Sequence, residues 1–216
     1  MNFDKKQLLL YAVTDRSQTD RQTFLTQIEE ALAGGVTLLQ LREKNLDEDS
    51  FLSEAMEVKE LCHRYGVPLI INDNVTVAFK SGADGVHVGM EDMPVADIRK
   101  QAGRDFIIGA TAKTIAQATQ AEAAGADYLG IGAVFPSPTK KNALRITQQQ
   151  LKEIAASVSI PAVAIGGINA DNASGLKDSG IAGIAVVSAI FSAENIRSAA
   201  AGLKQIALSV TTQTKE

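Results

Sequence analysis

The chain has few of the features that mark secreted, membrane or nucleic-acid-binding proteins. Its one cysteine, Cys62, excludes an intramolecular disulfide and favours a reducing compartment. No apolar run approaches the ~20 residues that span a bilayer, and Met1–Gln7 is polar and lacks a signal-peptide core. The formal net charge is −4, whereas a nucleic-acid binder usually carries a basic face. We therefore expect a cytoplasmic protein with no membrane or nucleic-acid partner.

Short apolar runs alternate with amphipathic stretches along the 216 residues. This alternation predicts repeated strand–helix units with parallel strands. The expected strands lie near 8–13, 36–41, 67–71, 84–88, 106–110, 127–132, 160–165 and 182–187. The expected helices lie near 20–33, 47–65, 74–81, 94–102, 114–124, 147–156, 170–178 and 193–207.

Eight units in a chain of this length favour a single (β/α)8 TIM barrel over an open doubly wound sheet. We expect one domain over 1–216, with short polar tails at about 1–7 and 208–216. A dinucleotide-binding sheet is disfavoured further, because Tyr11–Arg16 occupies the place where a G-x-G-x-x-G fingerprint would follow the first strand.

Four helix-to-strand junctions share one form and indicate an internal repeat. In each, a small residue ends the helix, a glycine takes the left-handed position, and an apolar run follows within a few residues. Thr147 and Gln150 also form a predicted capping box at a helix start. The four junctions are Ala33–Val36, Ser81–Asp84, Ala124–Asp127 and Ser179–Ala182.

Polar residues gather just after the apolar runs, which in a barrel form the rim where active sites are built. Gln40, Arg42 and Lys44 alternate at the end of the second strand, so their side chains point the same way. A guanidinium and an ammonium together suit a diphosphate. The alternative is a solvated strand end whose cations pair with Glu43 or with the acidic run 47–49.

Two carboxylates follow neighbouring strands: Asp73, which comes directly after Asn72, and Asp92. A single carboxylate after a strand is often only a helix N-cap. Two of them on adjacent loops beside two cations predict a Mg²⁺ site, because Mg²⁺ prefers oxygen ligands and shares substrate phosphates.

Thr111 and the loop Phe135–Lys141 follow the fifth and sixth predicted strands. The Thr111 hydroxyl suits either a phosphate or a helix cap. The loop carries Ser137, Thr139 and Lys140, a set that either wraps an anion or forms an ordinary polar surface connection.

Gly167 and Ser188 follow the last two strands, where barrels commonly bind phosphate. The alternative for the glycine is a tight turn. Two anion sites facing each other across one rim predict an enzyme that joins two phosphorylated small molecules. His87, inside the fourth strand, is expected to be structural rather than a catalytic base, and His63 and Cys62 are also expected to be structural.

The motifs in this order resemble the thiamine-phosphate synthase family over about residues 8–207. Each motif is modest alone, and their joint order is specific. They are Gln-Leu-Arg-Glu-Lys at 40–44, Ile-Asn-Asp at 71–73, Gly-Val-His-Val-Gly-Met-Glu-Asp at 85–92, Tyr-Leu-Gly-Ile-Gly-Ala-Val-Phe-Pro at 128–136, Thr-Lys at 139–140, Ala-Ile-Gly-Gly-Ile at 164–168 and Ala-Val-Val-Ser-Ala-Ile at 185–190.

The resemblance implies a transferase that joins a hydroxymethyl-aminopyrimidine diphosphate to a hydroxyethyl-thiazole phosphate, through a pyrimidine cation, to give thiamine phosphate and pyrophosphate. It implies Mg²⁺ on Asp73 and Asp92, and a loop at 135–146 that closes over the rim. Arg42, Lys44 and Lys140 would be the catalytic cations. The implied substrate contacts are Gln40, Arg42, Lys44 and Asn72 for the pyrimidine diphosphate, Thr111 and Lys140 for pyrophosphate, and Ser137, Thr139, Gly167, Val187 and Ser188 for the thiazole phosphate.

The chain departs from the family pattern at several positions, among them Thr111 in place of serine and Asn74 in place of a second aspartate, so Asn74 is left out of the metal site. Three rival functions stay open: a thiazole tautomerase-like paralogue, a non-catalytic regulator that binds the same precursors, and an unrelated phosphate-binding isomerase. The sequence also leaves homo-oligomerisation open.

Overall fold

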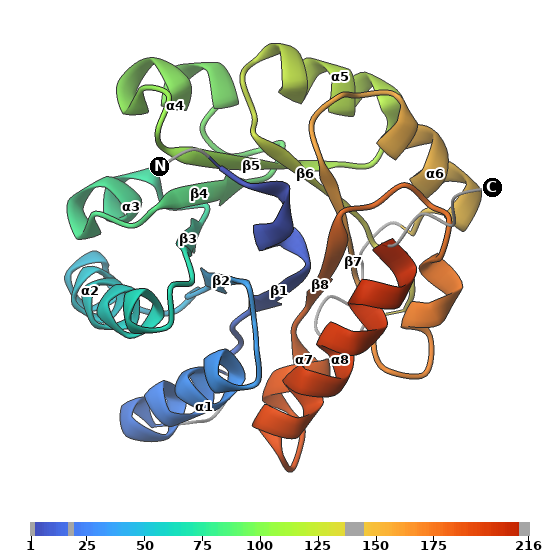
Figure 1. Ribbon diagram of the computed structural model, residues 1–216. Coiled ribbons are helices and arrows are strands. Elements are labelled where there is room, and N and C mark those ends of the chain that lie inside the picture. The colour runs from blue at the N-terminus through green and yellow to red at the C-terminus, as the bar shows by residue number, and fades with distance from the viewer. Residues whose placement is uncertain (1–2, 17–19, 137–144, 212–216) are drawn as a thin grey trace.

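The structure, a computed structural model, describes residues 3–16, 20–136 and 145–211. Eight parallel strands close into a barrel in chain order, and the helices surround them (Figure 1). The predicted (β/α)8 barrel is therefore confirmed. The strands are β1 (Leu10–Val13), β2 (Leu38–Leu41), β3 (Leu69–Asn72), β4 (Gly85–Val88), β5 (Ile107–Ala112), β6 (Tyr128–Gly132), β7 (Ala162–Ile165) and β8 (Gly183–Val186).

The helices lie where the sequence predicts them, except in the last two units. Among the described residues, none is long and apolar enough to cross a membrane. They are η1 (Lys5–Leu8), α1 (Arg21–Ala33), α2 (Glu48–Arg64), α3 (Val75–Ser81), α4 (Val95–Ala102), α5 (Ile115–Ala123), α6 (Gln148–Ala156), η2 (Ala173–Leu176), α7 (Ser188–Phe191) and α8 (Ile196–Thr211).

The helix expected over 170–178 is only the short 3₁₀ helix η2, and that prediction was wrong. The side chain of Asn169 accepts hydrogen bonds from the amides of Asp171 and Asn172, and Asn172 accepts one from the Asn169 amide. Such side-chain turns compete with helical hydrogen bonds. The helix expected over 193–207 instead runs from Ile196 to Thr211, and its last turn buries Val210.

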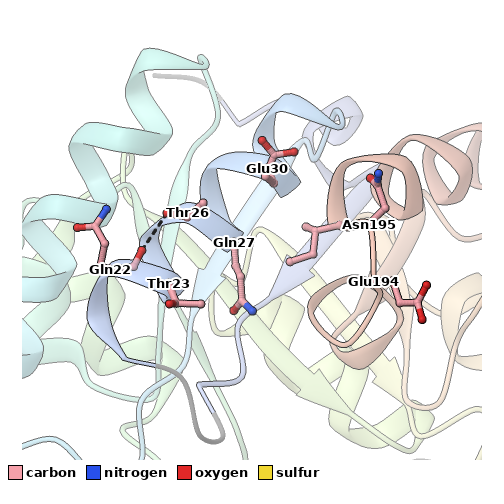
Figure 2. A pocket seen from close by; sticks show the side chains of 8 residues that line it. Gln22, Thr23, Thr26, Gln27, Glu30, Glu194 and Asn195 are labelled. Carbon is pink, nitrogen blue, oxygen red and sulfur yellow. Dashed lines mark hydrogen bonds between the residues drawn. The ribbon is translucent and has the colours of Figure 1, made fainter.

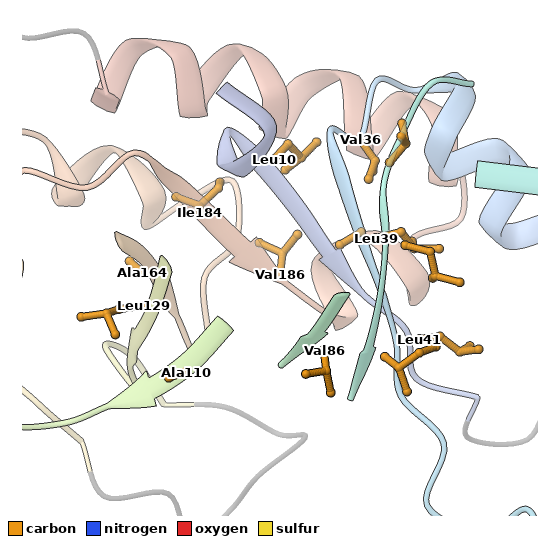
Figure 3. Close-up of a cluster of buried hydrophobic side chains, with 14 of the residues drawn as sticks. Leu10, Val36, Leu39, Leu41, Val86, Ala110, Leu129, Ala164, Ile184 and Val186 are labelled. Carbon is orange, nitrogen blue, oxygen red and sulfur yellow. The ribbon is translucent and has the colours of Figure 1, made fainter. Parts of the chain in front are cut away.

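Two apolar layers hold the barrel together. The larger layer lies between strands and helices and includes Leu10, Leu39 and Val86 (Figure 3). The smaller layer fills the lumen and includes Tyr11 and Tyr128. Because buried side chains fill it, the lumen is a packed core rather than a pore. Each fully buried large apolar side chain contributes roughly 1.5–3 kcal/mol to the stability of the fold.

The repeated junctions place an aspartate at the base of two strands. Gly82 and Gly125 have φ of 66° and 96°, so each glycine adopts the positive φ that the pattern predicts. Asp84 accepts a hydrogen bond of 2.8 Å from the Leu69 amide at the start of β3. Asp127 accepts one of 2.7 Å from the Ile108 amide in β5 and pairs with Arg99 at 2.6 Å. These carboxylates link neighbouring strands at the end of the barrel away from the predicted rim.

Replacing this link should destabilise the protein without touching the rim. We expect Asp127→Ala to lower the free energy of unfolding by about 1.5–3 kcal/mol, because two hydrogen bonds to a charged group are lost. Urea unfolding followed by circular dichroism measures the change. An unchanged midpoint would contradict the role given to Asp127.

Candidate active site

The carboxyl ends of β2, β3 and β4 bring the predicted cations and carboxylates together. Lys44 Nζ lies 2.6 Å from Asp73 Oδ2, although 29 residues separate them. The Asp73 backbone has φ of 60°, an uncommon conformation for a residue other than glycine. Its amide donates to the His87 carbonyl at 2.9 Å, which ties the end of β3 to β4. The predicted alternative, in which Lys44 pairs with Glu43 or with residues 47–49, is therefore wrong.

Asp92 lies against Asp73 on the next loop. Partial burial raises the pKa of Asp92, and the negative charge of Asp73 raises it further, while the Gly89 amide and Lys44 oppose these effects. Asp92 Oδ2 accepts the Gly89 amide at 2.7 Å, which fixes the loop. Two adjacent carboxylates repel each other, and a divalent cation between them would relieve that repulsion.

The donor set fits Mg²⁺. Among the described residues no group of three or more His, Cys, Asp or Glu side chains gathers at one point, so no full protein cage for a metal is formed there. Mg²⁺ commonly binds one or two carboxylates and completes its shell with water and substrate phosphates. Asn74 is not available as a further ligand, because its side chain accepts the Val77 amide at 2.9 Å as the N-cap of α3.

Gln40 and Arg42 lie at the same strand end but differ in burial. Gln40 is 4% exposed and donates from Nε2 to the Tyr11 hydroxyl inside the lumen. The Arg42 amide is held by the Thr14 hydroxyl at 2.9 Å. Among residues 3–16, 20–136 and 145–211, the Arg42 guanidinium forms no ion pair within 4.0 Å, so it is available to an anionic ligand.

Thr111 lies within β5 rather than after it, which corrects the predicted strand end at 110. Its hydroxyl is 3.1 Å from His87 Nε2, and Thr114 caps α5 instead. The alternative of a helix cap at Thr111 is therefore wrong. Burial lowers the pKa of His87 to about 4, against a small opposing effect of Asp73, so the imidazole is neutral near pH 7.

Asn72 pairs with His87 in the sheet register, which places it at the rim end of β3. Val187 directly follows β8, and Ser188 opens the four-residue helix α7. Both lie at the same end of the barrel as Asn72, because all eight strands are parallel.

The turn after β7 supports the end of the neighbouring β6 segment. Gly166 and Gly167 have φ of 101° and 66°, and the Gly166 carbonyl accepts the Phe135 amide at 3.0 Å. A side chain at Gly167 would collide with the carbonyl of Pro136. The predicted contacts Ser137, Thr139 and Lys140 lie outside the described residues, as does most of the loop at 135–146.

Sequence reasoning missed a buried charge cluster of Arg16, Glu43 and Glu54. Arg16 contacts Glu54 directly and lies 3.6 Å from Glu43, and its guanidinium stacks on the Phe24 ring. The side chains of Glu43 and Glu54 are 5% and 3% exposed. The available signal was a glutamate beside Ala55 within the apolar face of α2.

Glu43 lies between Arg42 and Lys44, so the cluster supports the backbone of the cationic strand end. Burial raises the pKa of Glu54 to about 7, and the charge of Glu43 adds to this, while Arg16 and Arg21 oppose it. One guanidinium faces two buried carboxylates, so one carboxylate retains a proton below about pH 7.

A pocket on the outside of the barrel differs from the rim in the charge of its lining. It lies between α1 and the start of α8, where Figure 2 shows Gln22, Glu30 and Glu194 around it. Among the described residues that line it there are two glutamates and no lysine or arginine, so this lining does not suit a phosphorylated ligand.

A TIM barrel whose rim combines a guanidinium without an ion pair in the described part of the chain, a lysine and two carboxylates defines a class of enzyme that acts on anionic substrates. The family model for thiamine monophosphate synthase matches residues 10–190. The thiamine-phosphate synthase of Desulfitobacterium hafniense (strain Y51) is 50% identical to the chain, over 91% of this chain and 96% of that protein. The thiamine-phosphate synthase of Ruminiclostridium cellulolyticum is 48% identical, over 91% of this chain and 94% of that protein. The chain therefore belongs to the thiamine monophosphate synthase family and is a transferase of thiamine biosynthesis.

Solved structures agree with this assignment. Thiamine phosphate pyrophosphorylase from Pyrococcus furiosus matches with a TM-score of 0.89 and 39% identity, over 96% of this chain and 99% of that one. A 3-hexulose-6-phosphate synthase matches with a TM-score of 0.72 at 17% identity, which shows the fold alone.

The buried glutamate pair should make stability depend on pH. Glu54 has a pKa of about 4.5 in the unfolded chain and about 7 in the folded one. Between these values only the folded state keeps the proton, so the free energy of unfolding falls as the pH rises from about 4.5 to about 7 and then levels off. We expect Glu54→Gln to remove this decline and to exceed the wild type by about 2 kcal/mol at about pH 8.

Urea unfolding of both proteins at several pH values measures the difference. Glu57→Gln is the matched control, since Glu57 lies on the same helix with an exposed side chain paired to Arg21. A wild-type-minus-variant difference that stays constant with pH would contradict the shared proton.

Proposed function

We propose that the chain condenses 4-amino-5-hydroxymethyl-2-methylpyrimidine diphosphate with 4-methyl-5-(2-hydroxyethyl)thiazole phosphate to give thiamine phosphate and pyrophosphate. The observation that carries this proposal is the convergence of Arg42, Lys44, Asp73 and Asp92 on one rim. Family membership supports the overall reaction, and the charge pattern supports the handling of a diphosphate.

The residue roles divide the rim into two sides. The β2–β4 side takes the pyrimidine diphosphate, and the β7–β8 side takes the thiazole phosphate. Thr111 and Lys140 contact the departing pyrophosphate. The proposed pyrimidine contacts are Gln40, Arg42, Lys44 and Asn72, and the proposed thiazole phosphate contacts are Ser137, Thr139, Gly167, Val187 and Ser188.

The proposed mechanism is dissociative. The bond between the pyrimidine methylene carbon and the bridging oxygen breaks first, and its electron pair leaves with pyrophosphate. The thiazole nitrogen then attacks the resulting cation. Arg42, Lys44 and Lys140 stabilise the charge that develops on the leaving group, and preorganised charges of this kind are commonly the largest catalytic contribution.

We infer that Asp73 and Asp92 hold Mg²⁺, since two adjacent carboxylates and a nearby lysine are what a shared metal and diphosphate require. A bound Mg²⁺ would neutralise the diphosphate, an effect on the order of several kcal/mol. The Lys44–Asp73 pair keeps both groups within reach of the same anion. The intracellular location also stays a proposal, and it rests on the single buried thiol of Cys62.

The rival functions make less use of these residues. A tautomerase needs a base that shuttles a proton, and the neutral His87 already has both ring nitrogens in hydrogen bonds with neighbouring side chains. An isomerase would leave the two carboxylates without a role. A regulator would bind both precursors and release nothing.

Mixing both precursors with the protein and Mg²⁺ should release pyrophosphate and form thiamine phosphate in equal amounts. Coupled detection of pyrophosphate, with chromatography of the thiazolium product, measures both. Removing Mg²⁺ by chelation should abolish release. Binding of the precursors without release would favour the regulator, and absence of binding would favour another substrate.

Removing one proposed metal ligand should slow turnover sharply. We expect Asp92→Ala to lower kcat by about a hundredfold or more, because charge neutralisation at the leaving group is lost. Asp97→Ala is the matched control, since Asp97 lies on α4 with an exposed side chain paired to Lys100. Normal Mg²⁺-dependent turnover in Asp92→Ala would remove Asp92 from the metal site.

A further inference from the structure

A continuous chain of hydrogen bonds crosses the barrel lumen beneath the rim. It connects five side chains from five different strands, and both of its ends are proposed substrate contacts. The links run from Gln40 Nε2 to Tyr11 Oη at 2.5 Å, from Tyr11 Oη to Tyr128 Oη at 2.7 Å, from Tyr128 Oη to His87 Nδ1 at 3.1 Å, and from His87 Nε2 to Thr111 Oγ1 at 3.1 Å.

The first link fixes the direction of every other one. Gln40 Nε2 is a donor, so the Tyr11 oxygen accepts there and the Tyr11 hydroxyl donates a hydrogen bond to Tyr128 Oη. The Tyr128 hydroxyl in turn donates a hydrogen bond to His87 Nδ1, which is therefore the unprotonated nitrogen. The proton of the neutral ring therefore lies on Nε2, and this N–H donates a hydrogen bond to Thr111 Oγ1.

Two inward-facing strand positions are glycines, and the absence of their side chains leaves space for this chain of hydrogen bonds. A side chain at Gly109 would collide with the Tyr128 ring and the His87 imidazole. A side chain at Gly130 would lie 3.0 Å from His87 Cε1. Phe3 stacks on the Tyr128 ring at a centroid distance of 5.7 Å, so the chain is also packed from the N-terminal segment. The arrangement is thus built into the lumen rather than formed by mobile side chains.

We propose that Tyr11, Tyr128 and His87 are positioning residues that set the hydrogen-bonding direction of Gln40 and Thr111 toward the substrates. This inference rests on the proposed function. Because Thr111 Oγ1 accepts a hydrogen bond from His87 Nε2–H, the Thr111 hydroxyl can donate its own hydrogen bond to the departing pyrophosphate. Because Gln40 commits its amide nitrogen to Tyr11, it presents Oε1, an acceptor, to the amino group of the pyrimidine.

The arrangement predicts substrate selectivity. An acceptor at Gln40 favours a pyrimidine with an exocyclic amine over the analogue with an oxo group at the same carbon, because two acceptors would face each other. If Tyr11 loses its hydroxyl, the Gln40 amide can rotate and present either end. The preference for the amine should then weaken.

The tautomer of His87 tests the direction of the chain without any substrate. The protein has only two histidines, so a sample labelled with ¹⁵N-histidine gives two imidazoles, and His63→Gln identifies which belongs to His87. We expect the Nε2–H tautomer in the wild type at neutral pH. A predominant Nδ1–H tautomer would overturn the proposal, and this measurement requires no variant in the lumen.

Hydroxyl deletion tests the functional consequence. We expect Tyr128→Phe to release His87 into a mixture of tautomers, and Tyr11→Phe and Tyr128→Phe each to lower kcat/KM for the pyrimidine diphosphate by about tenfold or more. The KM for the thiazole phosphate should stay unchanged. Tyr65→Phe is the matched control, since Tyr65 is 41% exposed at the end of α2.

The outcomes separate this inference from the proposed function. If the tyrosines are merely structural, Tyr11→Phe and Tyr128→Phe should lower thermal stability but leave the His87 tautomer and the preference for the amine unchanged. That result would overturn the proposal. If the wild-type protein has the Nε2–H tautomer but forms no thiamine phosphate, the proposed function fails while the direction of the chain stands.

Discussion

Closure of the sheet, in which β8 pairs with β1, is the constraint on which the site depends. Ala12 of β1 is in register with Val186 of β8, so the last strand ends beside the first at the same rim. In an open sheet of parallel strands the β2 and β8 ends would lie at different places along an edge. Only a closed ring brings the Arg42 segment and the Ser188 segment to the same opening, with β1 alone between them.

The rim concentrates charge, and the lumen beneath it is neutral. Lys44, Asp73 and Asp92 lie where water and ligands reach them, with Lys44 and Asp73 side chains 49% and 33% exposed. Directly below, the polar groups of Tyr11 and His87 are uncharged near pH 7, because burial raises the pKa of the phenol and lowers that of the imidazole. Hydrogen bonds between uncharged groups satisfy buried polar atoms, and burying such groups costs less desolvation free energy than burying charged groups.

Much of this arrangement was predictable from the sequence, because it depends on local pattern. The positions of Arg42, Lys44, Asp73 and Asp92 follow from strand ends, and strand ends follow from short apolar runs between helices. The length of η2 was not predictable in this way, because Asn169 and Asn172 form turns that only the surrounding fold selects.

The interior of the site was missed for a related reason. The alternation at 40–44 gives the direction of Gln40 but not its partner, since Tyr11 and Tyr128 lie 29 and 117 residues from the groups they bind. The Glu54 position broke the apolar pattern of α2, and the partner that explains it, Arg16, belongs to a different loop. Predicting contacts between distant segments requires the radius of the barrel and the register of its strands. Hydrophobic periodicity gives neither of them.

The glycines of β5 and β6 provide the space in which the polar side chains of the lumen lie. Gly109 and Gly130 contribute no side chain to the lumen, and glycine in a strand interior is unfavourable by itself. Their cost is explained if the space they leave is needed for His87 and Tyr128, whose atoms occupy it. A lumen selected only for stability would fill these positions with aliphatic side chains, as barrel interiors commonly do. The composition of the strands therefore favours polar positioning in the lumen over maximal packing.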